Sequence, residues 1–566
     1  MITLSRLSNR LATLAVCLVL GAPVAVRAQT LPYGDTAAPA SGEDGDAVTS
    51  AQPRRLDRVK ITPYIEAGQV ATAELSPGND TVTYSIIAAG VDAAIRGRNN
   101  QGSVSLRYER RIGWANTSNN GDTISGIARV SAAVVPRMLT IEAGAIAARS
   151  KVENNGAAVF GPLDLSDAVT QVYSVYAGPS LSTQVGDVAV SGGYRIGYTR
   201  VESPDAVISA PGQTPVDVFD DSIVHSANIH AGTKAGDVLP VGIGAGAGYN
   251  REDISNLDQR IEDFHARADV TVPVTSEVAL VGGVGWEKVQ VSSRDAARDI
   301  NGVPLVGGDG RLITDKSVPR VLAYDVSGLI WDAGVVWRPS RRTAFEAHVG
   351  RRYGSTTYYG SFAYAPSARS SVNVSVYDSI SGFGSQMNAA LAGLPTQFEA
   401  ARNPLTGDIN GCVIAQAQGN CLAGALGSVR SSVFRSRGVM ASYGVSLGRF
   451  QAGVGAGYDR RKFIGAPGTI LAVANGVIDE NYWAAAYLNG VIDRNSKFST
   501  NLYSNWYQSG DALAGQVSAI GATAAYYRSI TNHLTATAAL GIDGVNREKL
   551  QDVWSASALV GVRYSF

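Results

Sequence analysis

Apolar residues occupy alternate positions through the last thirteen residues of the chain, 554–566. One face carries Trp554, Ala556, Ala558, Val560, Val562, Tyr564 and Phe566. The opposite face is small or polar except for Leu559 and includes Ser555, Ser557, Gly561, Arg563 and Ser565. A strand with one face in lipid and the other in a polar lumen needs this alternation. The alternative is the closing strand of a soluble sandwich, but soluble β-proteins rarely end on a bare terminal strand.

The same period of two recurs along the chain, and the segments between the strands alternate in length. Residues 101–114 are the clearest example, and residues 122–134 and 138–152 form a pair joined by Pro136-Arg137 alone. Short and long connections tend to alternate, as in outer-membrane barrels with short periplasmic turns and long outer loops. Counting gives about 22 strands. The count includes strands at 342–352 and 356–365, which need a tight turn at Gly354-Ser355.

These patterns predict an all-β fold, a transmembrane antiparallel up-and-down β-barrel over residues 59–566. After the first segment no apolar run approaches the ~20 residues of a spanning helix, and a membrane chain without such helices must be a closed barrel. Residues 1–28 are predicted to be a cleaved signal peptide, with Arg6 and Arg10 before the apolar stretch 11–20. Residues 29–58, rich in Ala, Pro and Gly, are predicted to be a flexible periplasmic leader.

Composition excludes several functional classes. The chain has 63 Gly, 24 Tyr against 12 Phe and only 17% charged residues, which is not the balance of a soluble enzyme. Its formal net charge is zero, so no basic field points to nucleic acid. The aromatic end of the last strand, Val562, Tyr564 and Phe566, resembles the assembly signal of bacterial outer-membrane barrels. The predicted location is the outer membrane of a Gram-negative bacterium, with its lipid and its barrel-assembly machinery as partners.

Charged residues on the inward faces of the strands are the candidate functional residues of the lumen. They are Arg107, Glu109, Arg111, Asp332, Arg338, Glu346, His348 and Arg352. Such charges are costly in lipid, so we expect them to pair across the lumen or to meet solute. They could form a charged constriction that selects solutes or holds a plug. They could equally form a structural ladder of ion pairs that braces the wall.

No arrangement of residues predicts catalysis, a metal or a cofactor. The five histidines are scattered over different strands, and none lies in a nucleophile elbow or at metal-ligand spacing. They are His225, His230, His265, His348 and His533. An enzyme at the barrel rim remains a third hypothesis, because the lumen carries charge.

The segment 381–430 is far longer than a connection in a compact domain usually runs without structure. Residues 387–394 have apolar residues at helical spacing and predict a short helix. Cys412 and Cys421 lie close together in an oxidising compartment and predict a disulfide. We expect a disulfide-closed plug that lies against Asp332, Glu346, His348 and Arg352. The alternative is a cap exposed at the cell surface.

Residues 328–354 contain the turn Trp-Arg-Pro-Ser, an Arg-Thr after it and Gly-Arg-Arg-Tyr at the end of the next strand. This segment resembles a family of uncharacterised outer-membrane barrels associated with exosortase (PEP-CTERM) and exopolysaccharide systems. Similar chains are sometimes labelled as the preprotein translocase subunit YajC, a short protein with one membrane helix that nothing here matches. The resemblance implies a channel or export pore linked to surface polysaccharide. The alternative is a structural or adhesion barrel that acts through loops 153–167, 202–220 and 381–430.

Overall fold

A computed structural model gives the architecture of most of the chain. It describes residues 58–114, 121–152, 158–159, 169–202, 221–307, 311–415, 418–421, 426, 429, 432–510, 515–548 and 551–566. The predicted signal peptide, almost all of the predicted leader and most of loops 153–167 and 202–220 lie outside these residues.

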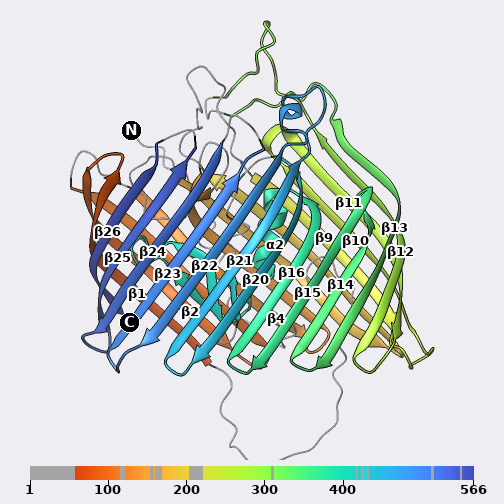
Figure 1. Cartoon of the computed structure of the whole chain (residues 1–566), viewed down its shortest axis with the longest axis horizontal. Helices are drawn as coiled ribbons and strands as arrows, with labels where there is room; N and C mark the ends of the chain where they lie inside the picture. Colours follow the sequence, from red (N-terminus) through yellow and green to blue (C-terminus); the bar gives the residue numbers. More distant parts are fainter. Residues whose placement is uncertain are drawn as a thin grey trace, which may run out of the picture.

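Twenty-two antiparallel strands form one closed ring (Figure 1). The first half comprises β1 (Arg58–Ser76), β2 (Thr81–Arg96), β3 (Asn100–Gly113), β4 (Gly121–Val135), β5 (Leu139–Val152), β7 (Val169–Val185), β8 (Val188–Glu202), β9 (Asp221–Thr233), β10 (Gly242–Ile254), β11 (Gln259–Pro273) and β12 (Val278–Ser293). The second half comprises β13 (Val321–Ser340), β14 (Thr343–Arg352), β15 (Ser355–Ser367), β16 (Ser370–Ser381), β20 (Phe434–Leu447), β21 (Phe450–Phe463), β22 (Ile478–Val491), β23 (Ser496–Gln508), β24 (Gln516–Ser529), β25 (Leu534–Arg547) and β26 (Val553–Ser565).

Each strand of the ring pairs with the next, and β26 pairs with β1 to close it. The sheet also contains β6 (Ala158–Val159), which pairs with β5 beside the ring and so is not counted in it. The prediction of about 22 strands is confirmed. The strands predicted at 342–352 and 356–365 are β14 and β15. Their turn lies one residue earlier than predicted, and in it Tyr353 (φ 53°) and Gly354 (φ 66°) take the left-handed conformation. Glycine adopts this conformation at little steric cost, which makes so tight a turn feasible.

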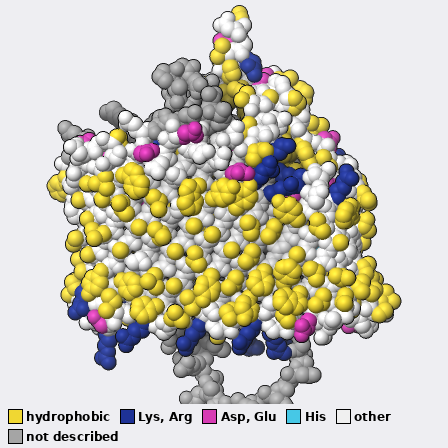
Figure 2. Space-filling model, in the orientation of Figure 1, with side chains coloured by type: hydrophobic (Ala, Val, Ile, Leu, Met, Phe, Trp, Pro, Cys, Tyr) yellow, Lys and Arg dark blue, Asp and Glu magenta, His cyan; other side chains and the backbone are white. Residues whose placement is uncertain are grey.

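The alternating faces lie as the sequence predicts. On β3, Leu106 and Tyr108 are exposed on the outside, whereas Arg107 and Glu109 are buried inside. Apolar side chains form a band around the outer wall in the face shown in Figure 2. Because neighbouring strands pair their backbone groups along the wall, the apolar band can face lipid. The chain is an outer-membrane β-barrel.

The two rims of the barrel differ. Turns such as the one at Gly186-Asp187 are short and share a rim with the carboxy-terminus, which is the periplasmic rim. The long connections lie at the opposite, outer rim, where the β12–β13 connection rises highest (Figure 1). The short 3₁₀ helices η1 (Asn256–Asp258) and η2 (Ile470–Ala474) belong to two other outer connections. Among the described residues, no helix is long and apolar enough to cross a membrane.

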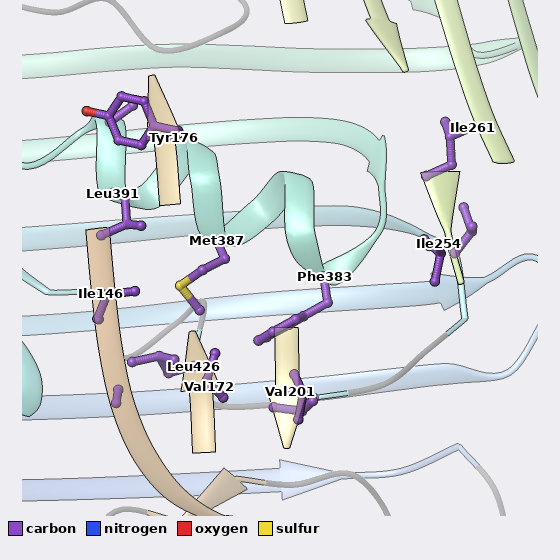
Figure 3. Close-up of a cluster of buried hydrophobic side chains, with 14 of the residues drawn as sticks. Ile146, Val172, Tyr176, Val201, Ile254, Ile261, Phe383, Met387, Leu391 and Leu426 are labelled. Atoms are coloured by element: carbon purple, nitrogen blue, oxygen red, sulfur yellow. The ribbon is translucent and has the colours of Figure 1, made fainter. Parts of the chain in front are cut away.

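The connection between β16 and β20 folds into the lumen. It contains helix α2 (Phe383–Ala392) and a small sheet of β17 (Glu399–Arg402), β18 (Ile409–Ala415) and β19 (Gln418–Cys421). We call residues 382–433 the plug. Its apolar residues join one buried cluster with inward side chains of β4, β5, β7 and β8 (Figure 3). This cluster is larger than the buried apolar clusters that the ring forms by itself.

Candidate functional site: the plugged lumen

Helix α2 packs along the inner wall of the barrel. Phe383, Met387 and Leu391 recur at helical spacing on one face and are essentially inaccessible to solvent. They contact the inward side chains of Val172 and Val201 on β7 and β8 (Figure 3). The helix begins after the extended Gly382 and ends at Gly393, whose N–H donates to carbonyls of the last turn. The sequence prediction of a helix is confirmed, although the helix starts four residues earlier than residue 387.

Small residues let this helix approach the wall closely. A Cβ atom on Gly197 of β8 would lie 2.2 Å from Oδ1 of Asn388. One on Gly384 would lie 1.9 Å from Oγ of Ser222 on β9. Real Cβ contacts are essentially never so short, so a larger residue at either position would displace the side chain that it meets. Gly197 and Gly384 therefore allow the helix and the wall to approach closely.

Polar bonds fix the start and the middle of the helix. The N–H of Gly382 donates to Oε2 of Glu252 on β10 over 2.9 Å. Nδ2 of Asn388 donates to Oγ1 of Thr199 over 3.2 Å. Glu252 is fully buried, so its carboxylate depends on such donors from the plug.

The second half of the plug is held by Arg402, at the end of β17. Its Nη1 donates to Oγ of Ser125 on β4 over 2.8 Å, and its Nη2 donates to Oγ of Ser105 on β3 over 2.9 Å. The same guanidinium donates to the carbonyl of Gly407 over 2.8 Å. One side chain thus joins two wall strands to the plug turn at residues 403–408.

An ion pair fixes the other side of this turn. Asp408 accepts hydrogen bonds from Nη2 and Nε of Arg149 on β5, at 2.7 and 3.1 Å. Both side chains are largely buried, with 11% of Arg149 and 14% of Asp408 exposed. We call Arg149, Arg402 and Asp408 the latch. Leu405, between the two anchors, packs against Ala525 and Ala539 of β24 and β25, so the turn contacts strands on both sides of the β26–β1 junction.

The two plug cysteines face one another along the backbone. Cys412 of β18 and Cys421 of β19 are direct partners in an antiparallel ladder. Directly opposite residues have Cα atoms about 4.5–5.5 Å apart, within the range that a disulfide spans. Their side chains lie outside those that the structure describes, and the described side chains contain no disulfide. The disulfide therefore stays a prediction.

The predicted lumen charges on β3 belong to one buried network. Arg107 binds Glu109 and, over 2.9 Å, Glu66 of β1, while Arg111 binds Glu109 over 2.7 Å. Arg563 of the last strand extends the network to Asp92 of β2 over 2.7 Å. Arg107 also donates to the carbonyl of Thr406 in the plug over 3.4 Å. This network closes the β26–β1 junction from inside and contacts the plug.

A second network holds the predicted charges of β13 and β14. Asp332 accepts bonds from Arg267 over 2.7 Å and lies 2.9 Å from Nδ1 of His348. Nε2 of His348 lies 3.0 Å from Glu346, and the ring stacks on Tyr359 at 4.7 Å. Both imidazole nitrogens are thus engaged by carboxylates, which leaves neither to act as a base toward a substrate.

Arg352 and Arg338 lie apart from this second network. Arg352 binds Asp263 over 2.9 Å and Glu287 over 3.2 Å, near the outer end of β11 and β12. Arg338 is exposed near the periplasmic end of β13 and forms no ion pair with any described residue. It is therefore separate from the charges that meet inside the barrel.

The predicted position of the plug is wrong. The plug contacts inward residues of β3–β10 and, through Leu405, of β24 and β25, whereas Asp332, Glu346 and His348 bind wall partners. Arg352 likewise binds the wall. These charged groups already form ion pairs with neighbouring strands, so a plug residue would gain little by binding them. Sequence reasoning missed Arg149, Glu252, Arg402 and Asp408, although the first two stand at inward positions of alternating strands.

No group of His, Cys, Asp and Glu residues in the described part of the chain could hold a metal ion. The arrangement is therefore best described as a lumen crossed by a bonded plug, with two networks of ion pairs in the wall.

Comparison with known proteins gives similarity in overall shape alone. No family model matches the chain, and no curated protein matches it in sequence. Among solved structures, the FrpB iron transporter of Neisseria meningitidis is 10% identical over 89% of this chain and 81% of its own, with a TM-score of 0.42. The ferric-catecholate import receptor Fiu of E. coli K12 is 10% identical over 91% and 82%, with a TM-score of 0.42. The ferric yersiniabactin receptor FyuA of Yersinia pestis is 12% identical over 90% and 80%, with a TM-score of 0.40.

Proposed function

We propose that this protein is a transport channel of the outer membrane that its own plug closes at rest. The observation that carries the proposal is the turn 403–408, held by the latch to one side of the ring and packed through Leu405 against β24 and β25. A ring of 22 strands is wide enough to need such a filling, because barrels of this size enclose a lumen that side chains alone do not fill.

The polar contacts of the turn 403–408, in contrast to the apolar packing of helix α2, support gating at this turn rather than permanent closure. A buried ion pair adds little net stability compared with apolar residues of the same volume, but it fixes one geometry. The Arg149–Asp408 pair and the hydrogen bonds of Arg402 fit this description. A plug held this way is well defined when closed, and its polar groups can be hydrated when it moves.

Conductance of the purified protein in planar bilayers tests the proposal. Ser381 and Phe434 are direct register partners, so a short Gly/Asn turn can replace residues 382–433 without stretching the ladder. The wild-type channel is expected to conduct rarely, and the shortened protein to conduct at a higher level. Failure of the shortened, folded barrel to conduct would refute a transport role.

We propose surface polysaccharide as the first cargo to test, because residues 328–354 resemble barrels associated with exopolysaccharide systems. The shortened barrel allows a direct assay. A polysaccharide that enters the lumen should block its current in a concentration-dependent way, and neutral dextran of similar length should serve as a comparison. Equal block by both polymers would argue against a selective polysaccharide pore.

A structural or adhesion role is the second candidate, and the β12–β13 connection favours it. The connection projects beyond the outer rim (Figure 1) and carries Ile300, fully exposed, and Val303, 57% exposed. Shortening residues 296–314 should abolish adhesion of cells to surface polymer if this role is the main one, while leaving conductance unchanged. A hydrolytic role would instead require an activity that His348→Ala removes.

A further inference from the structure

The barrel wall has a seam between β15 and β16 in its outer half. The two strands pair from Ser367↔Ser370 up to Gly360↔Val376, and there the ladder stops. Beyond it, residues 355–359 pair with β14 and residues 377–381 pair with β20. Backbone groups along this stretch therefore need other partners or remain open to solvent.

Two arginines of β20 reach across this seam. Nη2 of Arg437 donates to the carbonyl of Thr356 over 2.6 Å, and Nη1 of Arg435 donates to Oγ of Ser355 over 2.6 Å. Both guanidinium groups also bind Asp378 of β16, at 3.1 and 2.7 Å. One carboxylate thus pairs with two guanidinium groups, which leaves one net positive charge among these three side chains.

Further basic residues surround the seam on the lipid-facing side. The outward side chains here are Arg351, Arg435, Arg437, Arg460 and Lys462, against the acidic Asp378 and Glu480. Five positive and two negative charges leave a net charge of +3 (5 − 2). Figure 2 shows Lys and Arg side chains gathered near the outer edge of the apolar band. We call these five basic residues the outer basic patch.

Aromatic residues fix the depth of the patch in the membrane. Arg351 is the direct register partner of Trp331, whose side chain is 48% exposed. Arg460 and Glu480 lie one step beyond the outward pair Tyr458 and Tyr482. Aromatic girdles mark the membrane–water interfaces of such barrels. The outer basic patch therefore lies at the level of the lipid headgroups of the outer leaflet, where charge is inexpensive.

Elsewhere on the outer end, outward charges balance one another. Arg110 pairs with Asp122 over 2.8 Å. Arg251 and Arg260 share Asp253, and Arg251 lies 3.8 Å from Glu262, so two positive charges meet two negative ones. The excess at the seam is thus a local feature of this part of the wall.

We propose that the outer basic patch binds the phosphate groups of a phosphorylated glycolipid of the outer leaflet. Guanidinium groups donate two parallel hydrogen bonds to phosphate, and clusters of basic residues next to the bilayer recognise anionic headgroups. Arg351 and Lys462 have no acidic partner among the described residues, so they are available to a ligand. The acyl chains would lie along the apolar band below. This proposal concerns the outer wall and does not depend on the channel.

Native mass spectrometry of the purified, folded barrel tests it, with bisphosphorylated lipid A and enzymatically dephosphorylated lipid A as probes. The variant Arg351→Gln/Arg460→Gln/Lys462→Gln keeps the two arginines that brace the seam. It should retain the phosphorylated lipid at least about tenfold more weakly than the wild type, since each basic residue near the surface contributes about a fivefold preference. The matched control Arg110→Gln/Arg251→Gln should retain it like the wild type.

Three results would overturn the proposal. The first is equal retention by the patch variant and the wild type. The second is equal retention of phosphorylated and dephosphorylated lipid by the wild-type barrel, a comparison that needs no variant. The third is displacement of the lipid by millimolar inorganic phosphate, which would show that a free anion, and not a lipid headgroup, is what the patch recognises.

Discussion

Replacing Arg149 by Met should open the channel. The substitution keeps most of the side-chain volume on β5 but leaves Asp408 of the plug without its cation. The other carboxylate oxygen of Asp408, Oδ1, is buried and accepts no hydrogen bond from any residue that the structure describes. The closed state would therefore hold an uncompensated buried charge, which the plug can hydrate only by leaving its position.

The contacts at the latch set the size of this effect. Removing one partner of a buried ion pair costs about 3–5 kcal/mol, and both side chains here are largely buried. Because about 1.4 kcal/mol corresponds to a factor of ten, the ratio of closed to open channels should fall by about two to three and a half orders of magnitude. The stability of the ring itself should change much less, because the ladder hydrogen bonds of β5 are untouched.

Single-channel recording in planar bilayers measures this ratio directly. Arg149→Met should show frequent long openings where the wild type shows rare ones. The double variant Arg149→Met/Asp408→Leu should return to rare openings, because two apolar residues of matching size remove the stranded charge. Arg267→Met is the matched control, since it breaks a pair of similar burial, with Asp332, that involves only the wall.

Two outcomes would refute the reasoning. Rare openings in Arg149→Met, with the barrel folded, would show that the latch does not hold the plug closed. Frequent openings in Arg267→Met as well would show that any loss of buried charge pairing loosens the lumen, and that the latch has no special part.

Three further predictions concern the plug and the last strand. Gly407→Ala should also raise the open fraction, because Gly407 has φ 68° and a Cβ there would lie 1.7 Å from Nη1 of Arg107; unchanged openings would contradict the close approach. Cys412 and Cys421 should form a disulfide, so the mass of the intact chain should increase on reduction, and free thiols in the unreduced protein would disprove it. Deleting Phe566 should lower the fraction of protein that reaches the heat-modifiable folded form in cells, whereas Phe566→Tyr should keep it.

The ring can be predicted from the sequence because the alternation of side chains within each strand is a local pattern. The side chains of β3 and β26 alternate with a period of two, and an even number of strands returns the carboxy-terminus to the periplasmic rim. A glycine between two alternating segments predicts a turn at Gly354-Ser355 on the same grounds, and the structure places it one residue earlier, at Tyr353-Gly354. The helix in the plug could also be predicted, since Met387 and Leu391 are one turn apart.

The position of the plug could not be predicted, because it depends on which strands closure brings together. Arg402 binds Ser105, which lies 297 residues earlier in the chain. Inward charges on many strands follow the same alternation, so the pattern does not distinguish those that pair within the wall, such as Asp332, from those that meet the plug, such as Arg149. The partners of a charge are set by neighbouring strands in the folded ring, and sequence spacing does not encode them.

The plug is attached to the ring at both ends, and this constrains how it can enter the lumen. Its two ends join β16 and β20 at Ser381 and Phe434, which are direct register partners. Fifteen ring strands, β1–β5 and β7–β16, precede the plug in the chain, and β26 meets β1 only after the whole chain is available. Because both ends join strands at the outer rim, residues 382–433 enter and leave the lumen through its outer opening, whether or not β26 has yet met β1.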